Sequence, residues 1–364
     1  MCKISILHII TTIDIGGAEK QLQLLSAQQS SLGRNVTVMP LKGRVELYDD
    51  FTNSQVAIDL SLFQLNPISQ LRLVRRFIRM NQPSIIHAHL PRSELLVWAA
   101  FSIPFLRCQG RFVVSRHNAE AFVPKVPSLI SSWVSRLVLK KTHAVIAISE
   151  AVREFLFRHQ EVSKKQEVQV VYYGADLKQK RPPIKHKRDS ENLTLKTVCL
   201  ARFVEQKNHR LLIDAAESIK SEVSFKIDLF GEGPLKNEIA TEILKRNLNP
   251  IFSIHSKVNF SFDKLAEYDI LILPSRYEGF GLVLLEAMLA GIGIIASNTS
   301  AIPEVLGKEC QGLFEPDSCQ DLASKILRFS TNSELIDLKQ YSSARLSRFN
   351  IIETERLIYS IYSS

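Results

Sequence analysis

Short, almost uninterrupted runs of Ile, Val and Leu recur along the whole chain and alternate with amphipathic stretches. Such runs predict strands buried on both faces, as in parallel sheets covered by helices. We therefore predict an α/β fold with doubly wound parallel sheets. The strands predicted in the first half are Ile4–Ile10, Val36–Met39, Ser84–His87, Arg111–Ser115, Ala144–Ile148 and Val168–Tyr172. The helices predicted between them include Ala18–Ser31, Ser69–Met80 and Leu129–Lys140.

The second half repeats this rhythm after a polar, basic segment with two adjacent prolines. Its predicted strands are Thr197–Leu200, Lys226–Phe230, Ile251–Ile254, Ile270–Leu273, Ile292–Ala296 and Gly312–Phe314. We predict an N-terminal domain over residues 1–178, a linker over 179–192 and a C-terminal domain over 193–347. A helix at about 348–364 is expected to pack back on the first domain. Ligands of such sheets bind at the carboxyl ends of the strands, so a cleft between the two domains is expected.

Composition excludes several classes of protein. Of the 364 residues, 45% are hydrophobic and 23% are charged, which is typical of globular domains. The five cysteines are scattered and form no CxxC pair, which favours a reducing compartment. The N-terminal apolar run has no cleavage site, and the stretch Leu95–Leu106 is too short to span a bilayer. We expect a soluble cytoplasmic protein, with peripheral attachment to the inner face of the membrane as a further option.

Positive charge is concentrated in the first half of the chain. Residues 1–181 hold 24 Lys and Arg against 13 Asp and Glu, a net charge of +11, whereas residues 182–364 hold 22 against 24, a net charge of −2. A basic half indicates either an anionic partner or a solvated surface that favours solubility.

The segment Pro274–Gly291 combines a buried strand, a glycine-bearing turn and an apolar helix from about Leu282. Backbone N–H groups of Phe280, Gly281 and Leu282 at the helix start would form an anion site. Glu278 in the loop and Glu286 in the helix could accept hydrogen bonds from sugar hydroxyls, or could be ordinary surface acids. Because Glu286 interrupts an apolar helix, we expect it to have a partner.

Two cations follow the first strand of the second half. Arg202 and Lys207 lie in a strand-to-helix loop, and the helix is expected to open near Asn208. An arginine fork and a lysine point charge at this edge could hold a diphosphate. The alternative is a pair of exposed loop residues.

These segments belong to an ordered set of motifs by which the chain resembles glycosyltransferase family 4, the retaining enzymes with the GT-B fold. The resemblance covers nearly the whole chain and implies two Rossmann-like domains facing a cleft. The motifs are GGAE at Gly16–Glu19, HN at His117–Asn118, ISE at Ile148–Glu150, GAD at Gly174–Asp176, Arg202 with Lys207, GEGP at Gly231–Pro234, Glu278 with Glu286, and Pro303–Glu304.

The resemblance also implies roles for the site residues. Gly17 would bring backbone N–H groups close to the donor, and His117 would contact the hydroxyls or the developing charge of the reacting sugar. Arg202 and Lys207 would hold the diphosphate. Glu278 would bind sugar hydroxyls and Glu286 the ribose, while the amides of Phe280, Gly281 and Leu282 would address sugar and phosphate oxygens. The catalytic set is then His117, Glu278, Arg202 and Lys207.

Two positions depart from the family pattern. The family usually has a glycine-rich segment before Pro303–Glu304, where this chain has Ser300 and Ala301, so the loop there is more restricted. The family usually has Asn before the GAD turn, where this chain has Tyr173. Neither position belongs to the diphosphate or glutamate set, so we expect an active enzyme.

Two histidines and one basic helix allow other interpretations. His87 and His89 share one strand face and could ligate a metal, but with no third ligand apparent nearby a core or edge pair is favoured. No D-x-D follows a strand, so we expect no metal and no cofactor. GEGP does not match a dinucleotide-binding motif. The stretch Arg72–Met80 is an amphipathic helix with either a solvated or a membrane-facing basic side.

The sequence thus predicts a metal-independent retaining glycosyltransferase that moves a hexose-type sugar from a UDP- or GDP-linked donor. The expected acceptor is a glycan or a lipid-linked glycan of cell-surface polysaccharide synthesis, with an anionic membrane surface as a further partner and no nucleic acid. One alternative is a sugar-nucleotide epimerase of the same architecture, which would act on the donor alone. A second is a non-catalytic module that binds anions or membranes, which would leave the cations and glutamates of the second half unexplained.

Overall fold

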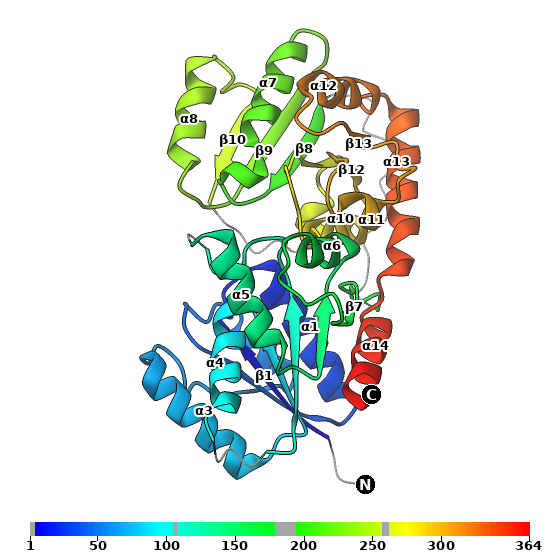
Figure 1. Ribbon diagram of the computed structural model, residues 1–364. Helices are drawn as coiled ribbons and strands as arrows, with labels where there is room; N and C mark the ends of the chain where they lie inside the picture. Colours follow the sequence, from blue (N-terminus) through cyan, green and yellow to red (C-terminus); the bar gives the residue numbers. More distant parts are fainter. Residues whose placement is uncertain (1–3, 105–107, 125, 179–193, 257–261) are drawn as a thin grey trace. The chain divides into compact units, whose positions relative to one another are not determined.

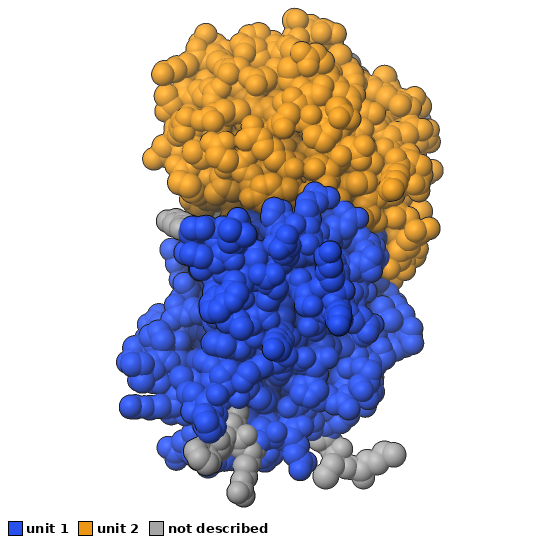
Figure 2. Space-filling view, in the orientation of Figure 1, with its two compact units in different colours: residues 1–176, 349–364 blue, residues 177–348 orange. Residues whose placement is uncertain are grey.

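The computed structural model describes residues 4–104, 108–124, 126–178, 194–256 and 262–364. The chain divides into an N-terminal domain, Met1–Asp176 with Phe349–Ser364, and a C-terminal domain, Leu177–Arg348, which Figure 2 colours separately. The division falls within two residues of the predicted boundary at 178. The predicted linker, residues 179–192, lies outside the described residues.

The N-terminal domain is built on a seven-stranded sheet in the order β3-β2-β1-β4-β5-β6-β7, with every pair parallel. Its strands are β1 (Ser5–Ile10), β2 (Asn35–Pro40), β3 (Ala57–Ile58), β4 (Ile85–His89), β5 (Arg111–Arg116), β6 (Ala144–Ala147) and β7 (Val168–Val170). Its helices are α1 (Gly17–Ser31), α2 (Tyr48–Asn53), α3 (Pro67–Asn81), α4 (Pro91–Ser102), α5 (Ser128–Leu139), α6 (Glu150–Arg158) and α14 (Ile351–Ser363).

Figure 1 shows α3, α4 and α5 on one face of this sheet, with α1 and α14 on the other. This arrangement follows from right-handed crossovers, because the strand order runs in opposite directions from β1. The sheet is buried on both faces, which explains why its strands lack the polar alternation of half-exposed strands.

The C-terminal domain has a six-stranded parallel sheet in the order β10-β9-β8-β11-β12-β13. Its strands are β8 (Leu195–Leu200), β9 (Phe225–Phe230), β10 (Phe252–His255), β11 (Ile270–Leu273), β12 (Gly293–Ser297) and β13 (Leu313–Phe314). Its helices are η1 (Glu205–Lys207), α7 (His209–Ile219), α8 (Lys236–Lys245), α9 (Phe262–Leu265), α10 (Leu282–Ala290), α11 (Ile302–Leu306), α12 (Cys319–Arg328), α13 (Asn332–Arg345) and η2 (Leu346–Arg348). The predicted α/β class with doubly wound parallel sheets is confirmed, and every strand predicted above overlaps an observed one.

The last helix, α14, returns to the N-terminal domain. Ile351, Ile358 and Ile361 pack in the same core cluster as Ile6 and Val113 of the sheet. Backbone hydrogen bonds join Ala175 to Phe349 and to Ile351, with N–O distances of 2.9 and 3.0 Å, so the GAD turn holds the start of the helix. The first domain is therefore completed by residues that follow the second.

Gly174 in this turn allows the close approach. A Cβ built on Gly174 would lie 2.5 Å from Cα and 2.6 Å from the backbone nitrogen of Ile351. Neither atom can move without displacing α14.

We predict that Gly174→Ala destabilises the N-terminal domain by about 1–3 kcal/mol, the usual cost of overpacking a tight contact. Urea unfolding followed by tryptophan fluorescence measures this domain alone, because the two tryptophans, Trp98 and Trp133, both lie in it. An unchanged urea midpoint would show that the turn can open without cost.

Candidate active site

The predicted donor-binding residues of the C-terminal domain gather where its strand order reverses, between β8 and β11. Arg202 and Lys207 follow β8, and Glu278 follows β11. Ligands of open α/β sheets bind at such a switch point, outside the carboxyl ends of the strands.

Lys207 and Glu278 form an ion pair. The Nζ of Lys207 lies 2.5 Å from Oε1 of Glu278, and the hydroxyl of Ser275 donates to the same oxygen at 2.7 Å. Glu278 is only 6% exposed, and a buried carboxylate requires such partners. The cation predicted to hold a diphosphate and the acid predicted to bind sugar hydroxyls are therefore in direct contact.

Hydrogen bonds join the two loops that carry this pair. The backbone N–H of Arg276 donates to the carbonyl of Gln206 at 2.8 Å, and the side-chain amide of Gln206 donates to the carbonyl of Tyr277 at 2.9 Å. Asn208, at the start of α7, donates to Asp317 at 2.8 Å. The ion pair is thus supported by a fixed backbone, which is how a site is organised before its ligand arrives.

The side chain of Arg202 is exposed, but its backbone is tightly held. Gly231 and Gly233 of the GEGP motif lie so close to the backbone of Ala201 and Phe203 that a Cβ at either glycine would clash. GEGP therefore braces the loop of Arg202.

Helix α10 starts beside these loops without a side-chain cap. Gly281 precedes it with φ +84, a left-handed conformation that favours glycine. Phe280 is buried, and Leu282 is the first helical residue. Glu286 is partly buried within a helix that is otherwise almost wholly apolar.

In the N-terminal domain the strand order reverses between β1 and β4. Gly17, the exposed first residue of α1, follows β1, and His117 directly follows β5. Leu90, after β4, has φ +73, a strained conformation for a large side chain that is often found near functional sites. The two predicted residues of this domain therefore also lie at the carboxyl edge of its sheet.

His117 ends a buried chain of hydrogen bonds. Gln29 Oε1 lies 2.8 Å from Nε2 of His8, whose Nδ1 lies 3.0 Å from Nε2 of His89. The Nδ1 of His89 lies 3.0 Å from Nε2 of His117, and the Nδ1 of His117 lies 2.5 Å from the hydroxyl of Tyr173. Each neutral imidazole donates with one nitrogen and accepts with the other, so one tautomer choice fixes all three.

This chain of hydrogen bonds has two consequences for the predicted site. Both ring nitrogens of His117 are occupied by protein groups, so a sugar hydroxyl can bond to either nitrogen only if a partner is displaced. Tyr173, which the sequence treats as a departure outside the donor site, contacts the predicted catalytic histidine directly. His8 escaped sequence analysis because only the pairing of β1 with β4 brings it beside His89.

The prediction that no third candidate metal ligand lies near His87 and His89 is wrong, because the fold brings His8 beside them. His8, His87 and His89 present ring nitrogens that all lie within 4.8 Å of one another. The hydroxyls of Tyr362 and Ser115 occupy the two nitrogens of His87 at 2.6 and 2.8 Å. These hydrogen bonds account for the buried cluster as core polar groups, in agreement with the favoured core interpretation.

Burial keeps the histidines neutral. It lowers the pKa of His8 to about 4 and that of His117 to about 3. The pKa of His87 and His89 also falls well below 6.5, first through burial and then through repulsion between neighbouring rings. Near pH 7 the ring of His117 is therefore neutral and carries no positive charge of its own.

A buried arginine anchors the loop that follows His117. The guanidinium of Arg116 lies 3.0 Å from Glu94 of α4 and 3.0 Å from Glu161, and it donates to the hydroxyl of Ser135 of α5 at 2.9 Å. Glu161 in turn accepts from the backbone N–H of Phe122 at 2.8 Å. The end of β5, two helices and the loop after His117 thus share one polar cluster.

Several remaining motifs have structural roles. Ser149 of ISE caps α6 by accepting from the N–H of Val152 at 3.1 Å. Ser300, where the family usually has glycine, adopts φ +51. The segment before Pro303–Glu304 therefore contains a left-handed residue although serine replaces glycine.

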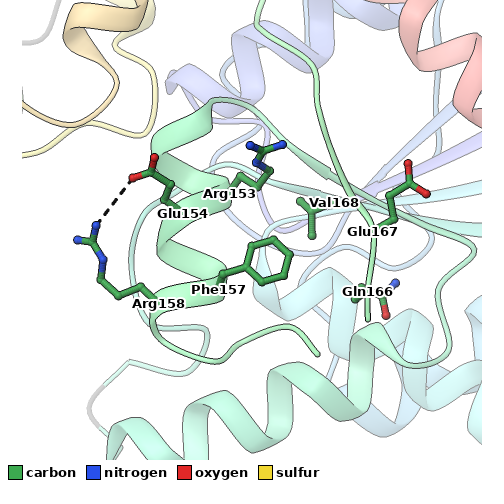
Figure 3. A pocket seen from close by; sticks show the side chains of 7 residues that line it. All are labelled: Arg153, Glu154, Phe157, Arg158, Gln166, Glu167 and Val168. Carbon is green, nitrogen blue, oxygen red and sulfur yellow. Dashed lines mark ion pairs between the residues drawn. The ribbon is translucent and has the colours of Figure 1, made fainter. Parts of the chain in front are cut away.

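A surface hollow of about 520 Å³ lies between α6 and the start of β7 (Figure 3). It is lined by Arg153, Glu154, Phe157, Arg158, Gln166, Glu167 and Val168. Val168 is the first residue of β7, so the hollow lies at the amino end of that strand, away from the carboxyl edge with His117. It contains none of the predicted site residues.

Two family models match consecutive parts of the chain. Residues 15–179 match the model described as Glycosyltransferase Family 4, and residues 180–344 match the model described as Glycosyl transferases group 1.

Individual relatives span nearly the whole chain. The phosphatidylinositol N-acetylglucosaminyltransferase GPI3 subunit of Saccharomyces cerevisiae (strain YJM789) is 24% identical over 377 residues, covering 96% of this chain and 80% of its own. The structure of Anabaena Alr3699/HepE in complex with UDP-glucose has a TM-score of 0.81 at 18% identity and covers 98% and 99% of the two chains. A mutant of S. aureus TarM in complex with fondaparinux, alpha-GlcNAc-glycerol and UDP has a TM-score of 0.78 at 12% identity, covering 99% and 100%.

The lowered histidine pKa values predict acid sensitivity of the N-terminal domain. Histidines that stay neutral when folded take up protons on unfolding, so their contribution is present above pH 6.5 and is lost as pH falls towards about 4. Each such group contributes a slope of about 1.4 kcal/mol per pH unit. Urea unfolding followed by tryptophan fluorescence at several pH values measures this pH dependence of the free energy of unfolding.

The variant His8→Gln isolates this effect from other titrating groups. Burial raises the pKa of Glu94 to about 7, and that carboxyl changes stability in the opposite direction over the same range. The difference between the wild-type and variant curves cancels such shared contributions. The variant should have the shallower slope between pH 6 and pH 5, and parallel curves would contradict the prediction.

Proposed function

Because the chain belongs to glycosyltransferase family 4 and has the GT-B fold, we propose that it moves a hexose-type sugar, with retention of configuration, from a UDP- or GDP-linked donor to a glycan or lipid-linked acceptor. The observation that carries the proposal is the set of Arg202, Lys207 and Glu278 at the switch point of the C-terminal sheet. The UDP-glucose and UDP in the two similar structures support a nucleotide-sugar donor.

The two cations act on the diphosphate. Arg202 is exposed and offers a planar fork, and Lys207 offers a point charge next to Glu278. As the bond from the anomeric carbon to the diphosphate oxygen breaks, negative charge grows on that oxygen. Preorganised cations stabilise this charge more in the transition state than in the bound donor, and this difference lowers the barrier.

The acid and the helix address the sugar and the nucleoside. Glu278, held by Lys207 and Ser275, keeps acceptor capacity for sugar hydroxyls, because a carboxylate has about four lone-pair sites. Glu286 would bind ribose hydroxyls. Helix α10 has no side-chain cap at its N-cap residue Gly281, and its dipole favours negative oxygens near the backbone N–H groups of Phe280, Gly281 and Leu282.

In the N-terminal domain, Gly17 and His117 would meet the reacting sugar. The exposed, side-chain-free Gly17 at the start of α1 supports close approach of backbone N–H groups to the donor. The hydrogen-bond chain behind His117 supports a neutral ring of fixed orientation, which can face developing positive charge without repelling it.

Retention follows if the acceptor hydroxyl attacks the face from which the diphosphate departs. The new bond joins the acceptor oxygen to the anomeric carbon, the old bond to the diphosphate breaks, and the acceptor proton passes to a donor phosphate oxygen. Atoms and charges then balance without a second carboxylate. Positioning and charge stabilisation supply the catalysis.

We further propose that the acceptor is presented at an anionic membrane surface, as in cell-surface polysaccharide synthesis on the inner face of the membrane. The net charge of +11 over residues 1–181 supports this surface. The yeast relative, named for a phosphatidylinositol acceptor, supports a lipid-linked acceptor. Among the described residues no helix is long and apolar enough to cross a bilayer.

We predict that Arg202→Ala lowers kcat/KM by an amount equivalent to about 2–4 kcal/mol, as expected when a group that stabilises a developing anion is removed. Arg202 is the cleaner of the two cations to test, because its exposed side chain can be truncated without burying a charge. Lys245→Ala on α8 is a matched control, since it also removes an exposed cation of the C-terminal domain. Transfer from the preferred nucleotide sugar is measured, and near-normal kcat/KM in Arg202→Ala would overturn the assignment.

Lys207→Ala is expected to abolish turnover as well, but it leaves the buried Glu278 without its cation. The double variant Lys207→Ala/Glu278→Gln removes that unpaired charge. Thermal unfolding of both variants separates loss of stability from loss of chemistry. If the double variant is stable yet active, Lys207 does not stabilise the diphosphate.

We predict that transfer survives EDTA, because the two cations and the start of α10 replace a metal at the diphosphate. Initial rates with and without chelator are compared. Loss of activity that returns on adding Mg²⁺ or Mn²⁺ would contradict the metal-independent mechanism. Incubation with donor alone distinguishes an epimerase, which would convert the donor sugar without any acceptor.

A further inference from the structure

Helix α5 presents apolar side chains to solvent. Leu129 is 79%, Trp133 57% and Ile130 52% exposed, all within the first two turns. Leu129, Trp133, Arg136 and Lys140 recur at intervals of four, three and four residues, so they form one stripe along the helix. The stripe is apolar at its start and basic at its end.

The inward face of the same helix carries serines. Ser131 accepts from the backbone N–H of Val123 at 2.9 Å. Ser132 donates to the carbonyl of His159 at 2.7 Å, and Ser135 donates to the carbonyl of Glu161 at 2.9 Å. These buried hydroxyls are satisfied by the fold, so in the first two turns of α5 the usual pattern of an amphipathic helix is reversed for a structural reason, whereas Val138 and Leu139 further along are buried.

An exposed apolar group beside cations points to a partner with an apolar interior and an anionic surface. We propose that the outer face of α5 docks on an anionic membrane. Leu129, Ile130 and Trp133 enter the interfacial region, and Arg136 and Lys140 contact the head groups. Tryptophan favours this depth, because its ring is apolar and its N–H remains near water. This inference deepens the membrane-surface part of the proposed function and rests on it.

Neighbouring helices extend the basic surface. Helix α3 contacts α4, which contacts α5, and the three lie on one face of the sheet (Figure 1). Arg72, Arg76 and Arg79 of α3 are exposed. Arg75 is not available, because its guanidinium donates to the carbonyl of Ala100 in the last turn of α4 and to those of Ile103 and Pro104, which follow the helix. The basic side predicted for Arg72–Met80 therefore consists of Arg72, Arg76 and Arg79, without Arg75.

The apolar end of α5 is close in sequence to His117, the predicted catalytic residue of this domain. The helix follows β5 and the loop that begins with His117, so Leu129 and Ile130 lie towards the carboxyl edge of the sheet. A membrane held at this end would present a lipid-linked acceptor to the edge where His117 lies.

A second copy of the chain is a poorer occupant of this face. Two such faces meeting across a twofold axis would bring Arg136, Lys140 and the arginines of α3 towards their equivalents, and like charges at an interface are costly. Anionic lipid neutralises the same cations instead.

Single-tryptophan protein tests the docking directly. Trp98→Phe leaves Trp133 as the only tryptophan. With phosphatidylglycerol-containing vesicles, Trp133 emission should shift to the blue and be quenched by brominated acyl chains, and the protein should float with the vesicles. With pure phosphatidylcholine vesicles both signals should be much weaker. No blue shift, or equal binding to both vesicles, would overturn the proposal.

Two double variants separate the apolar and the electrostatic contributions to membrane binding. Leu129→Ser/Trp133→Ser should lower the partition coefficient at least about tenfold, as expected for losing two buried apolar side chains. Arg136→Gln/Lys140→Gln should lower it by about fivefold for each cation and should reduce its salt dependence. Leu244→Ser/Lys245→Gln on α8 removes one exposed apolar and one exposed basic side chain from the C-terminal domain and should have no effect. Equal effects of the control and α5 variants would reject α5 as the docking face.

Failure of this inference is distinguishable from failure of the proposed function. Nucleotide binding, measured by thermal shift with UDP and GDP, should be unchanged in the α5 variants, because α5 lies outside the C-terminal domain. If the protein binds UDP or GDP but no vesicles, only the membrane claim is overturned. If analytical ultracentrifugation shows a dimer that Leu129→Ser/Trp133→Ser abolishes, the face is a subunit interface instead.

Discussion

Parallel pairing of every described strand determines where chemistry can occur in this chain. Both sheets are covered by helices, so the side chains along their strands are mostly apolar. The backbone N–H and C=O groups of the strands bond to neighbouring strands. Side chains that need water or ligand can then project only from strand ends. The reversal of strand order between β8 and β11 separates two adjacent loops, and the ion pair of Lys207 with Glu278 joins those loops at this point.

The N-terminal sheet departs from this rule, because β1 and β4 carry buried histidine rings. His8 and His87 are opposite each other in the strand register, and His89 lies two residues further along β4, opposite Ile10. Such burial is tolerable only when every ring finds partners, because an unpaired buried polar group costs about 1–3 kcal/mol. The resulting chain ends at His117 and Tyr173, so a core requirement for complete hydrogen bonding also sets the tautomer of a predicted site residue.

The sequence predicted the strands and the C-terminal site loops because both depend on local pattern. Ile/Val/Leu runs indicate buried strands wherever they occur, and Arg202, Lys207 and Glu278 lie in the loops that follow such runs. It did not predict His8 beside His89, or Tyr173 against His117, because these contacts depend on which strands become neighbours. The loss of Arg75 from the basic surface likewise depends on α3 packing beside the end of α4.

Helix α5 shows how one buried charge can determine an outer surface. Arg116 needs several acceptors inside the domain, and Ser135 is one of them, alongside Glu94 and Glu161. Satisfying this cluster and the nearby carbonyls turns the serine face of α5 inward. Leu129 and Trp133 lie on the opposite face of the helix, so they are exposed to solvent although their hydrophobicity alone would favour burial. A local conflict between pattern and packing usually marks a functional constraint, and here its product is an apolar stripe ending in cations.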